Sequence, residues 1–408
     1  MKRKFFRMTA LALTGAMGLG FSACGGDSGA GKDGLSKDNI KIGLICLHDD
    51  NSTYDANFIK AMDEAKKNLG LKDSQVIVKT NVPETSECKE AAVDLADQGC
   101  NIIFADSFGH ESYMLEAAEQ FPDVQFCHAT GTLAHTEKKS NFHDAFASIY
   151  QGRYLAGIAA GLKLNEMIDA GTITADKAQM GYVGAFTYAE VISGYTSFYL
   201  GAKSVCPSVT MQVQFTGSWY DETAEKEAAT TLINKGCVLI SQHADSMGAP
   251  TACENANVPN ISYNGSTKDA CPNTFIVSSR INWAPYYEYA VNCVLEGKDI
   301  GYDWTGDLST GSVVLTEVNE QAAAPGTQEA INEAMEKLKN GSVHVFDTAN
   351  FTIAGAQLTT YMADVDTDAN YEGDTEAIKD GYFHESESRS APYFDLRIDG
   401  ITLLNDMY

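Results

Sequence analysis

The chain has 408 residues, with 29 Lys or Arg against 55 Asp or Glu and a formal net charge of −26. A surface this acidic argues against nucleic-acid binding and favours solubility. The other composition values are those of an ordinary globular protein, and the length predicts two domains with sizeable cores.

The N-terminus carries an export signal. Residues 1–7 hold four basic side chains, an apolar run follows from Met8 to Gly20, and small residues stand just before Cys24. This order predicts a secretory signal peptide over residues 1–23. Cleavage of the signal peptide would remove these four basic residues, so the mature protein would be more acidic still.

The small residues before Cys24 and the two glycines after it are similar to a bacterial lipobox, although Phe21 replaces the usual Leu. We therefore expect Cys24 to become the lipidated first residue and residues 24–38 to form a flexible, lipid-anchored linker. The expected location is the extracytoplasmic face of the cell membrane. An ordinary cleaved signal is the alternative. No later stretch reaches the ~20 apolar residues of a membrane helix.

Nine cysteines remain besides Cys24, without CxxC or other metal-ligand spacing. Most lie in or directly after apolar strands, as Cys46, Cys127 and Cys237 do. This placement favours buried small hydrophobic residues over disulfides, although the sequence leaves their pairing open. No metal or other cofactor is predicted.

From Ile40 the sequence alternates strands and helices with short loops. Apolar runs predict strands at 40–47, 75–80, 101–106 and 124–128, and amphipathic stretches predict helices at 56–69, 88–98 and 110–120. A second series follows, with strands at 179–183, 211–215, 238–242, 260–263 and 274–279, and helices at 150–167, 189–205, 223–235, 248–256 and 283–295. Beyond Val313 the pattern loosens, apart from a helix at 327–340 and an acidic loop at 364–376.

The two series contain an internal repeat. Seven residues of the window 89–100, in the pattern KEAAxxLxxxGC, recur at a constant offset of 137 in the window 226–237. Each copy has a strand before it and a strand after it, and each ends in Asp-Ser. A repeat this long predicts two similarly built lobes. The copies differ most at one loop, where Trp219 stands in the place of Val82.

The predicted fold class is therefore α/β, with two doubly wound Rossmann-like lobes joined by a hinge. We assign residues 39–142 and 273–312 to the N-terminal lobe, and residues 143–272 and 313–408 to the C-terminal lobe. The chain would cross between the lobes three times.

Ligands of such sheets bind outside the carboxyl ends of the strands. The strand-to-helix loops here combine aromatic residues with Asp, Asn and Ser: Tyr54-Asp55, Ser107-Phe108, Phe186, Ser218-Trp219, Asp245-Ser246 and Asn264. Flat faces with a few fixed polar groups suit a flat ligand with polar edges.

Residues in these loops are also suited to purely structural roles. Asp55, Ser107 and Asp221 are suited to capping helices, Phe108 and Phe186 to packing in a core, and Trp219 to packing between lobes. His243 and Asp245 are possible metal ligands, but a third ligand at suitable spacing is missing. The chain has no GxSxG, P-loop or GxGxxG motif, so no catalytic residue is predicted and an enzyme is not expected.

Several runs carry a family resemblance: IFADSFGHESYMLEAAEQFPDVQFCHATG, IYQGRYLAGIAAG, MGYVGAF with Glu190, TGSWYDETAEKEAATTLINKG, ISQHADS, SYNG and NWAPYY. Together they resemble the basic-membrane-protein family of ABC-transporter substrate-binding lipoproteins, from Ile40 to about Lys298. The resemblance implies a type I periplasmic-binding fold with a three-strand hinge, an ABC permease as partner, and a purine nucleoside or nucleobase as ligand.

The resemblance also implies the ligand-binding residues: Tyr54, Asp55, Ser107, Phe108, Phe186, Trp219, Asp245 and Asn264. In the family an aromatic residue followed by Asn typically stacks on and reads the base, so Asp55 is a departure. We expect a monomer that closes on its ligand. A receptor for a sugar or other small polar metabolite, a sensor, and an exported hydrolase are the alternatives.

Overall fold

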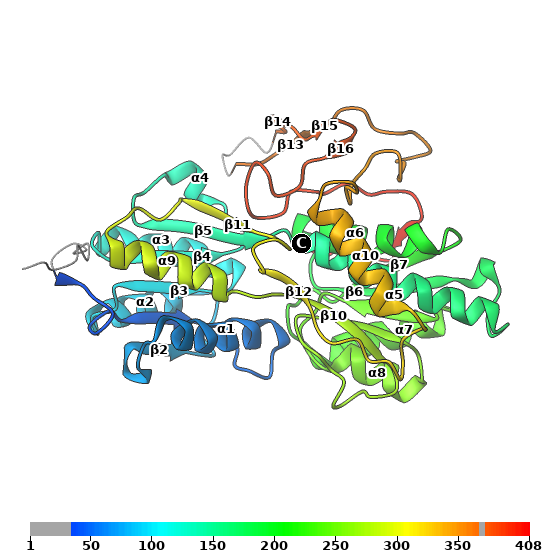
Figure 1. Cartoon of the computed structure of the whole chain (residues 1–408), viewed down its shortest axis with the longest axis horizontal. Coiled ribbons are helices and arrows are strands. Elements are labelled where there is room, and N and C mark those ends of the chain that lie inside the picture. The colour runs from blue at the N-terminus through cyan, green and yellow to red at the C-terminus, as the bar shows by residue number, and fades with distance from the viewer. Residues whose placement is uncertain (1–33, 367–371) are drawn as a thin grey trace, which may run out of the picture.

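The computed structural model describes residues 34–366 and 372–408. The predicted signal peptide, Cys24 and most of the expected linker lie outside the described residues. Two β-sheets, each flanked by helices, lie side by side (Figure 1). The α/β fold class predicted from the sequence is confirmed.

The first sheet has the strand order β11-β5-β4-β3-β1-β2, and all of its pairings are parallel. Alternate residues face opposite sides, so that Ile102 and Phe104 join one core while Ile103 and Ala105 join another. The strands are β1 (Ile42–Ile45), β2 (Val76–Lys79), β3 (Ile102–Ala105), β4 (Gln125–Ala129), β5 (Phe142–Ala147) and β11 (Asp303–Gly306). Its helices are α1 (Thr53–Leu69), α2 (Ser86–Asp97), α3 (Glu111–Gln120), α4 (Leu133–Glu137) and α9 (Ala284–Glu296).

The second sheet has the order β12-β10-β9-β8-β6-β7-β17, and only the β10–β12 pairing is antiparallel. Its strands are β6 (Gln179–Gly184), β7 (Thr210–Phe215), β8 (Leu239–Gln242), β9 (Asn260–Tyr263), β10 (Phe275–Ile281), β12 (Val313–Leu315) and β17 (Ile401–Leu403). Its helices are α5 (Ile149–Asp169), α6 (Ala189–Val205), α7 (Glu222–Asn234), α8 (Gly248–Ala256) and α10 (Thr327–Lys339).

The sequence repeat corresponds to β2-α2-β3 in the first sheet and β7-α7-β8 in the second. In both copies the helix ends at a glycine with positive φ, Gly99 at 87° and Gly236 at 95°. The next residue, Cys100 or Cys237, donates its N–H to the carbonyl five residues back at 3.1 Å. The repeated Gly-Cys pair is therefore a helix stop followed by a buried side chain, since only Gly adopts this backbone without strain.

The strand pairing places two of the three crossings between the lobes at other residues than the sequence predicted. β5 pairs with β4 and β11, so the chain leaves the first sheet at Ser148 rather than after Phe142. β10 pairs with β9, so the chain stays in the second sheet until Asn282 rather than leaving it near Pro272. The third crossing lies between β11 and β12, close to the expected place.

The three crossings are hydrogen-bonded to one another. The N–H of Ser148 donates to the carbonyl of Gly306, and that of Asn282 donates to the carbonyl of Ser312, both at 2.7 Å. The crossings therefore form one hinge of three neighbouring segments.

The C-terminal segment after α10 contacts both sheets. Its last strand, β17, pairs with β7, while the N–H of Ser390 donates to Asp303 of β11 at 2.6 Å. The segment also holds β13 (Met362–Ala363), β14 (Thr375–Glu376), β15 (Ile378–Lys379) and β16 (Tyr382–Phe383), which lie above the junction of the sheets in Figure 1. We expected residues 313–408 to belong to the second lobe alone, but this segment also contacts β11 of the first sheet.

The nine cysteines of the described chain are unpaired and buried, as their apolar surroundings predict. Among the described residues, no helix has both the length and the apolar character needed to cross a membrane.

Candidate functional site

A cavity lies between the two sheets, at the carboxyl ends of their strands. Its free space is about 390 Å³, counting the part that is open to solvent. The first lobe lines it with Leu47, His48, Tyr54, Asp55, Ser107, Phe108 and Thr130, and the second with Glu190, Trp219, His243 and Asp245. Because both lobes supply walls, hinge motion changes the size of the cavity.

Six of the eight residues predicted to bind the ligand line this cavity: Tyr54, Asp55, Ser107, Phe108, Trp219 and Asp245. The other two lie behind it. The Phe186 ring packs edge-on against Trp219, with 5.1 Å between ring centroids. Asn264 donates from Nδ2 to Oδ1 of Asp245 at 3.1 Å. Each of these two residues positions a neighbour that lines the cavity.

The structure shows which of the loop residues cap a helix and which do not. Asp221 caps α7, because its Oδ1 accepts the N–H of Ala224 at 2.9 Å. Ser52, and not Asp55, caps α1. Ser107 makes no cap and instead donates to Glu84 at 2.6 Å. Phe108 is 45% exposed, so the alternative that it packs in the core is wrong.

The loop after β1 fixes two adjacent candidates. Asp55 lies in the first turn of α1, and its Oδ1 accepts the N–H of His48 at 2.8 Å. The preceding side chain, Tyr54, reaches across to the next strand, and its hydroxyl donates to the backbone carbonyl of Asp106 at 2.7 Å. The Tyr54 ring also packs against Phe58 within α1. Both side chains are therefore held on the wall of the first lobe.

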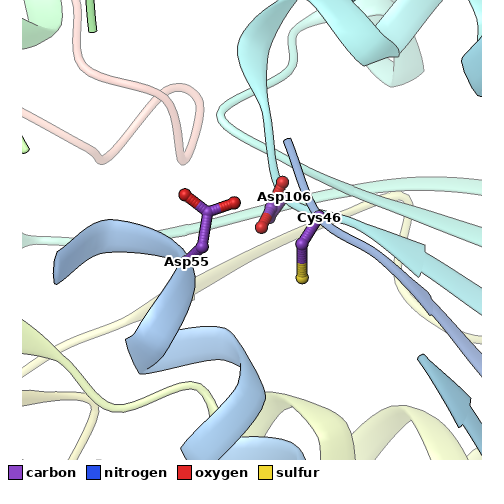
Figure 2. Close-up of side chains that lie close together, drawn as sticks. All are labelled: Cys46, Asp55 and Asp106. Atoms are coloured by element: carbon purple, nitrogen blue, oxygen red, sulfur yellow. The ribbon is translucent and has the colours of Figure 1, made fainter. Parts of the chain in front are cut away.

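Asp55 belongs to a buried acidic cluster. Figure 2 shows it beside Asp106 and Cys46, which follow β3 and β1. The three ligand atoms lie within 4.8 Å of one another. Burial raises the pKa of Asp106 well above its usual range, and the charge of Asp55 adds to this. Burial likewise raises the pKa of the Cys46 thiol. Two buried carboxyls this close repel each other when both are charged.

A second group with metal-ligand spacing is formed by Glu111, His128 and Asp144. A Cβ placed on Gly131 would come 2.4 Å from an atom of each of the three side chains, so only glycine fits beside them. Glu111 accepts the N–H groups of the loop after β4. The group thus holds the loop that presents Thr130 to the cavity.

On the second lobe, aromatic packing holds Trp219. Its ring lies 5.1 Å from Phe186 and 6.2 Å from both Tyr188 and His243, measured between centroids. Its backbone carbonyl accepts the N–H of Asp245 at 3.0 Å. These ring contacts are all within the second lobe. The indole forms a wall of the cavity.

Hydrogen bonds join the lobes beside the cavity. The backbone N–H of Thr53 donates to the carbonyl of Asp245 at 3.1 Å. The side chain of Asn57 donates to Oδ1 of Asn264 at 3.2 Å. Asn264 has a φ of 64°, a conformation that Asn tolerates better than most residues. One asparagine therefore connects α1 of the first lobe to Asp245 of the second.

The candidate set omitted His48, Thr130, Glu190 and His243, which also line the cavity. Arg153 donates to Nδ1 of His243 at 3.1 Å, which places the imidazole proton on Nε2, 3.4 Å from Glu190. Burial lowers the pKa of His243, so it is neutral. Thr130 directly follows β4, and this position was the signal that could have identified it.

The Bmp family model, described as ABC transporter substrate-binding protein PnrA-like, matches residues 42–348. A purine-binding protein of Brucella abortus is 30% identical over 265 residues, which are 64% of this chain and 71% of that protein. A putative ABC transporter glucose-binding protein of Haloferax volcanii is 30% identical over 257 residues, covering 61% of this chain and 62% of that one.

Solved structures agree on the fold. A solute-binding protein of an ABC transporter system from Conexibacter woesei superposes with a TM-score of 0.61 at 21% identity, covering 75% of this chain and 98% of that one. The predicted type I periplasmic-binding fold is confirmed. The family match covers most of the chain and stops before the segment that carries β13 to β17. The chain therefore belongs to the Bmp family of PnrA-like ABC-transporter substrate-binding proteins, and it is a solute-binding protein rather than an enzyme.

Proposed function

We propose that this protein is a lipid-anchored receptor that captures a purine nucleoside or nucleobase between its lobes and delivers it to an ABC importer. Substrate-binding proteins of ABC transporters work outside the cytoplasm, take up a small molecule and present it to permease subunits. The proposal adds the ligand, the anchor at Cys24 and a monomeric state.

The observation that carries the ligand proposal is the lining of the cavity. Tyr54 stands on one lobe and Trp219 on the other, with buried carboxyls at Asp55 and Asp245. A flat heterocycle between the two rings would gain stacking of about 0.5–1.5 kcal/mol beyond the burial of its area. Its polar edge would meet Asp55, and ribose hydroxyls would have Asp245 as an acceptor. The purine-binding relative in Brucella abortus supports this ligand class.

A sugar is the second candidate. The relative in Haloferax volcanii is named as a putative glucose-binding protein, and Trp beside carboxylates also suits a pyranose ring. We favour a purine because three aromatic side chains, Tyr54, Phe108 and Trp219, line the cavity.

The test is a thermal-shift screen of protein refolded from denaturant, which removes carried-over ligand. A ligand that binds only the folded state stabilises that state by mass action, by about 2.7 kcal/mol at a hundred times its Kd. This stabilisation raises the melting midpoint. We expect purine nucleosides or bases to raise it and glucose, galactose and ribose to leave it unchanged. A shift with sugars alone would replace the purine proposal with the sugar one. A transport role is separated from sensing by uptake of labelled ligand in cells lacking the gene.

A further inference from the structure

The side chains lining the cavity leave acceptors free and use most of their donors internally. Tyr54 donates to the carbonyl of Asp106, Ser107 to Glu84 and Thr130 to the carbonyl of Ala129. The Nε2 proton of His243 faces Glu190. Only the Trp219 indole and the His48 ring remain as side-chain donors in the lining.

The acceptors are carboxyls. Asp55, Glu190 and Asp245 all line the cavity, and among the described residues no Lys or Arg does. Asp55 and Asp245 are buried. Oδ1 of Asp55 accepts the N–H of His48 and its Oδ2 lies 3.8 Å from Nδ1 of the His48 ring, while Oδ1 of Asp245 accepts from Asn264. A carboxylate offers about four lone-pair positions, so each has capacity left. The ligand that fits such a lining is one that donates hydrogen bonds.

Asp106 holds Asp55 in this role. It is fully buried, its Oδ1 accepts the N–H of Leu47 at 3.1 Å, and its Oδ2 has no hydrogen-bond donor among the described residues. The carboxyl of Asp55 lies within 4.8 Å (Figure 2). A proton carried by Asp106 would face Asp55 and fix the orientation of that carboxyl, with lone pairs of Asp55 left available to the ligand.

Resting on the proposed purine function, we propose that the cavity selects a purine edge with two adjacent N–H donors, the pattern of guanine, and that Asp55 reads this edge while Asp106 positions it. The N1–H and the 2-amino group of guanine match the two oxygens of one carboxylate. Hypoxanthine lacks the amino group, and xanthine has a carbonyl there, which a carboxylate repels. An Asn at position 55 would lose this discrimination, because an amide also donates.

The test is calorimetry of the refolded protein with guanosine, inosine and xanthosine. A charge-assisted hydrogen bond predicts guanosine binding about tenfold or more tighter than inosine, with xanthosine weakest. Asp55→Asn should bring guanosine and inosine close to equal affinity and should bind xanthosine more tightly than the wild type, a gain that misfolding cannot produce. Asp221→Asn is the matched control, because Asp221 caps α7 outside the cavity lining and Asn also caps well.

A separate pair of variants tests whether Asp106 positions Asp55. Asp106→Ala should reduce the preference for guanosine over inosine, and Asp106→Asn should restore it, because an amide still donates toward Asp55. An unchanged preference in Asp106→Ala would remove the positioning role. Guanosine binding that disappears after chelation and returns with Zn²⁺ would assign the cluster to a metal ion and overturn the positioning role of Asp106.

The outcomes separate this inference from the proposed function. If purines bind but inosine equals guanosine in the wild type, or if Asp55→Asn keeps the wild-type preference, the inference fails and the purine function stands. If no purine binds and a sugar does, both fail.

Discussion

The hydroxyl of Tyr54 donates to the backbone carbonyl of Asp106 at 2.7 Å, which ties the first aromatic wall of the cavity to the strand end that carries the acidic cluster. Trp219, on the opposite lobe, has no comparable polar tie among the hydrogen bonds described and is held by aromatic packing. The two walls therefore differ in what holds them, and Trp219 can be truncated without leaving a buried polar group unpaired.

Trp219→Ala should weaken purine binding by about tenfold or more, because it removes one stacking surface and the area that it buries. The side chain is only half-buried in the second lobe, so the melting midpoint without ligand should change little. Calorimetry and thermal melts measure the two effects. Trp219→Phe, which keeps a ring, should lie between alanine and the wild type, and wild-type affinity in the alanine variant would take Trp219 out of the site.

Asn264→Asp should weaken ligand binding at pH 7 by about tenfold, because it places a carboxylate beside Asp245 in place of a donor. Burial already raises the pKa of Asp245 well above its usual range, and a second buried carboxyl raises it further. The loss should become smaller as the pH falls toward 5, since the introduced carboxyl donates again once it is protonated. Affinities measured at both pH values test this; a loss independent of pH would mean that the bond between lobes matters more than the charge.

Glu225 should make stability depend on pH. Burial raises its pKa to about 7 from an ordinary 4.5. As the pH rises from about 4.5 to 7, Glu225 ionises in the unfolded state before it ionises in the folded state, so the free energy of unfolding falls. Above pH 7 Glu225 is ionised in both states, and its contribution no longer changes with pH. The loss is on the order of 3 kcal/mol.

The matched variant is Glu225→Gln, which keeps an acceptor for the N–H groups of Ser246 and Asp221. Urea unfolding of both proteins at pH 5 and pH 7.5 should show the wild type losing stability relative to the variant at the higher pH. Equal changes in the two proteins would assign the pH dependence to the general acidity of the chain.

Cys24→Ala should release the protein from the membrane. The lipidated cysteine is the proposed anchor, and no membrane-spanning helix occurs among the described residues. Detergent partitioning and incorporation of labelled palmitate check this: the wild type should partition with lipid and the variant should not. Membrane retention of an unlabelled variant would contradict the anchor.

The repeat was the part of the fold that sequence predicted best. KEAAxxLxxxGC specifies a helix, a left-handed stop and a buried strand start, all of which are local, so β2-α2-β3 and β7-α7-β8 follow from it. β11 was missed because its four residues, DWTG, are short, partly exposed and without an apolar run. β5 was missed because His143 and Asp144 interrupt its apolar pattern, although both are buried.

The candidate site was predicted from loop position, and its limits follow from the same reasoning. Strand-end residues such as Tyr54, Ser107 and Asp245 line the cavity because parallel strands end at one edge. Loop position cannot show which side of a loop faces inward, so Phe186 and Asn264 were grouped with residues that they only support. Glu190 lies inside a helix, where loop content gives no signal.

Whether the cavity binds a purine between its lobes is decided by titrating guanosine into refolded wild-type protein in a calorimeter, with glucose as the parallel titration. We predict saturable binding of one guanosine per chain, with a negative heat-capacity change from burial of the base, and no binding of glucose. Saturable binding of glucose with no heat from guanosine, adenosine or inosine would contradict a purine receptor.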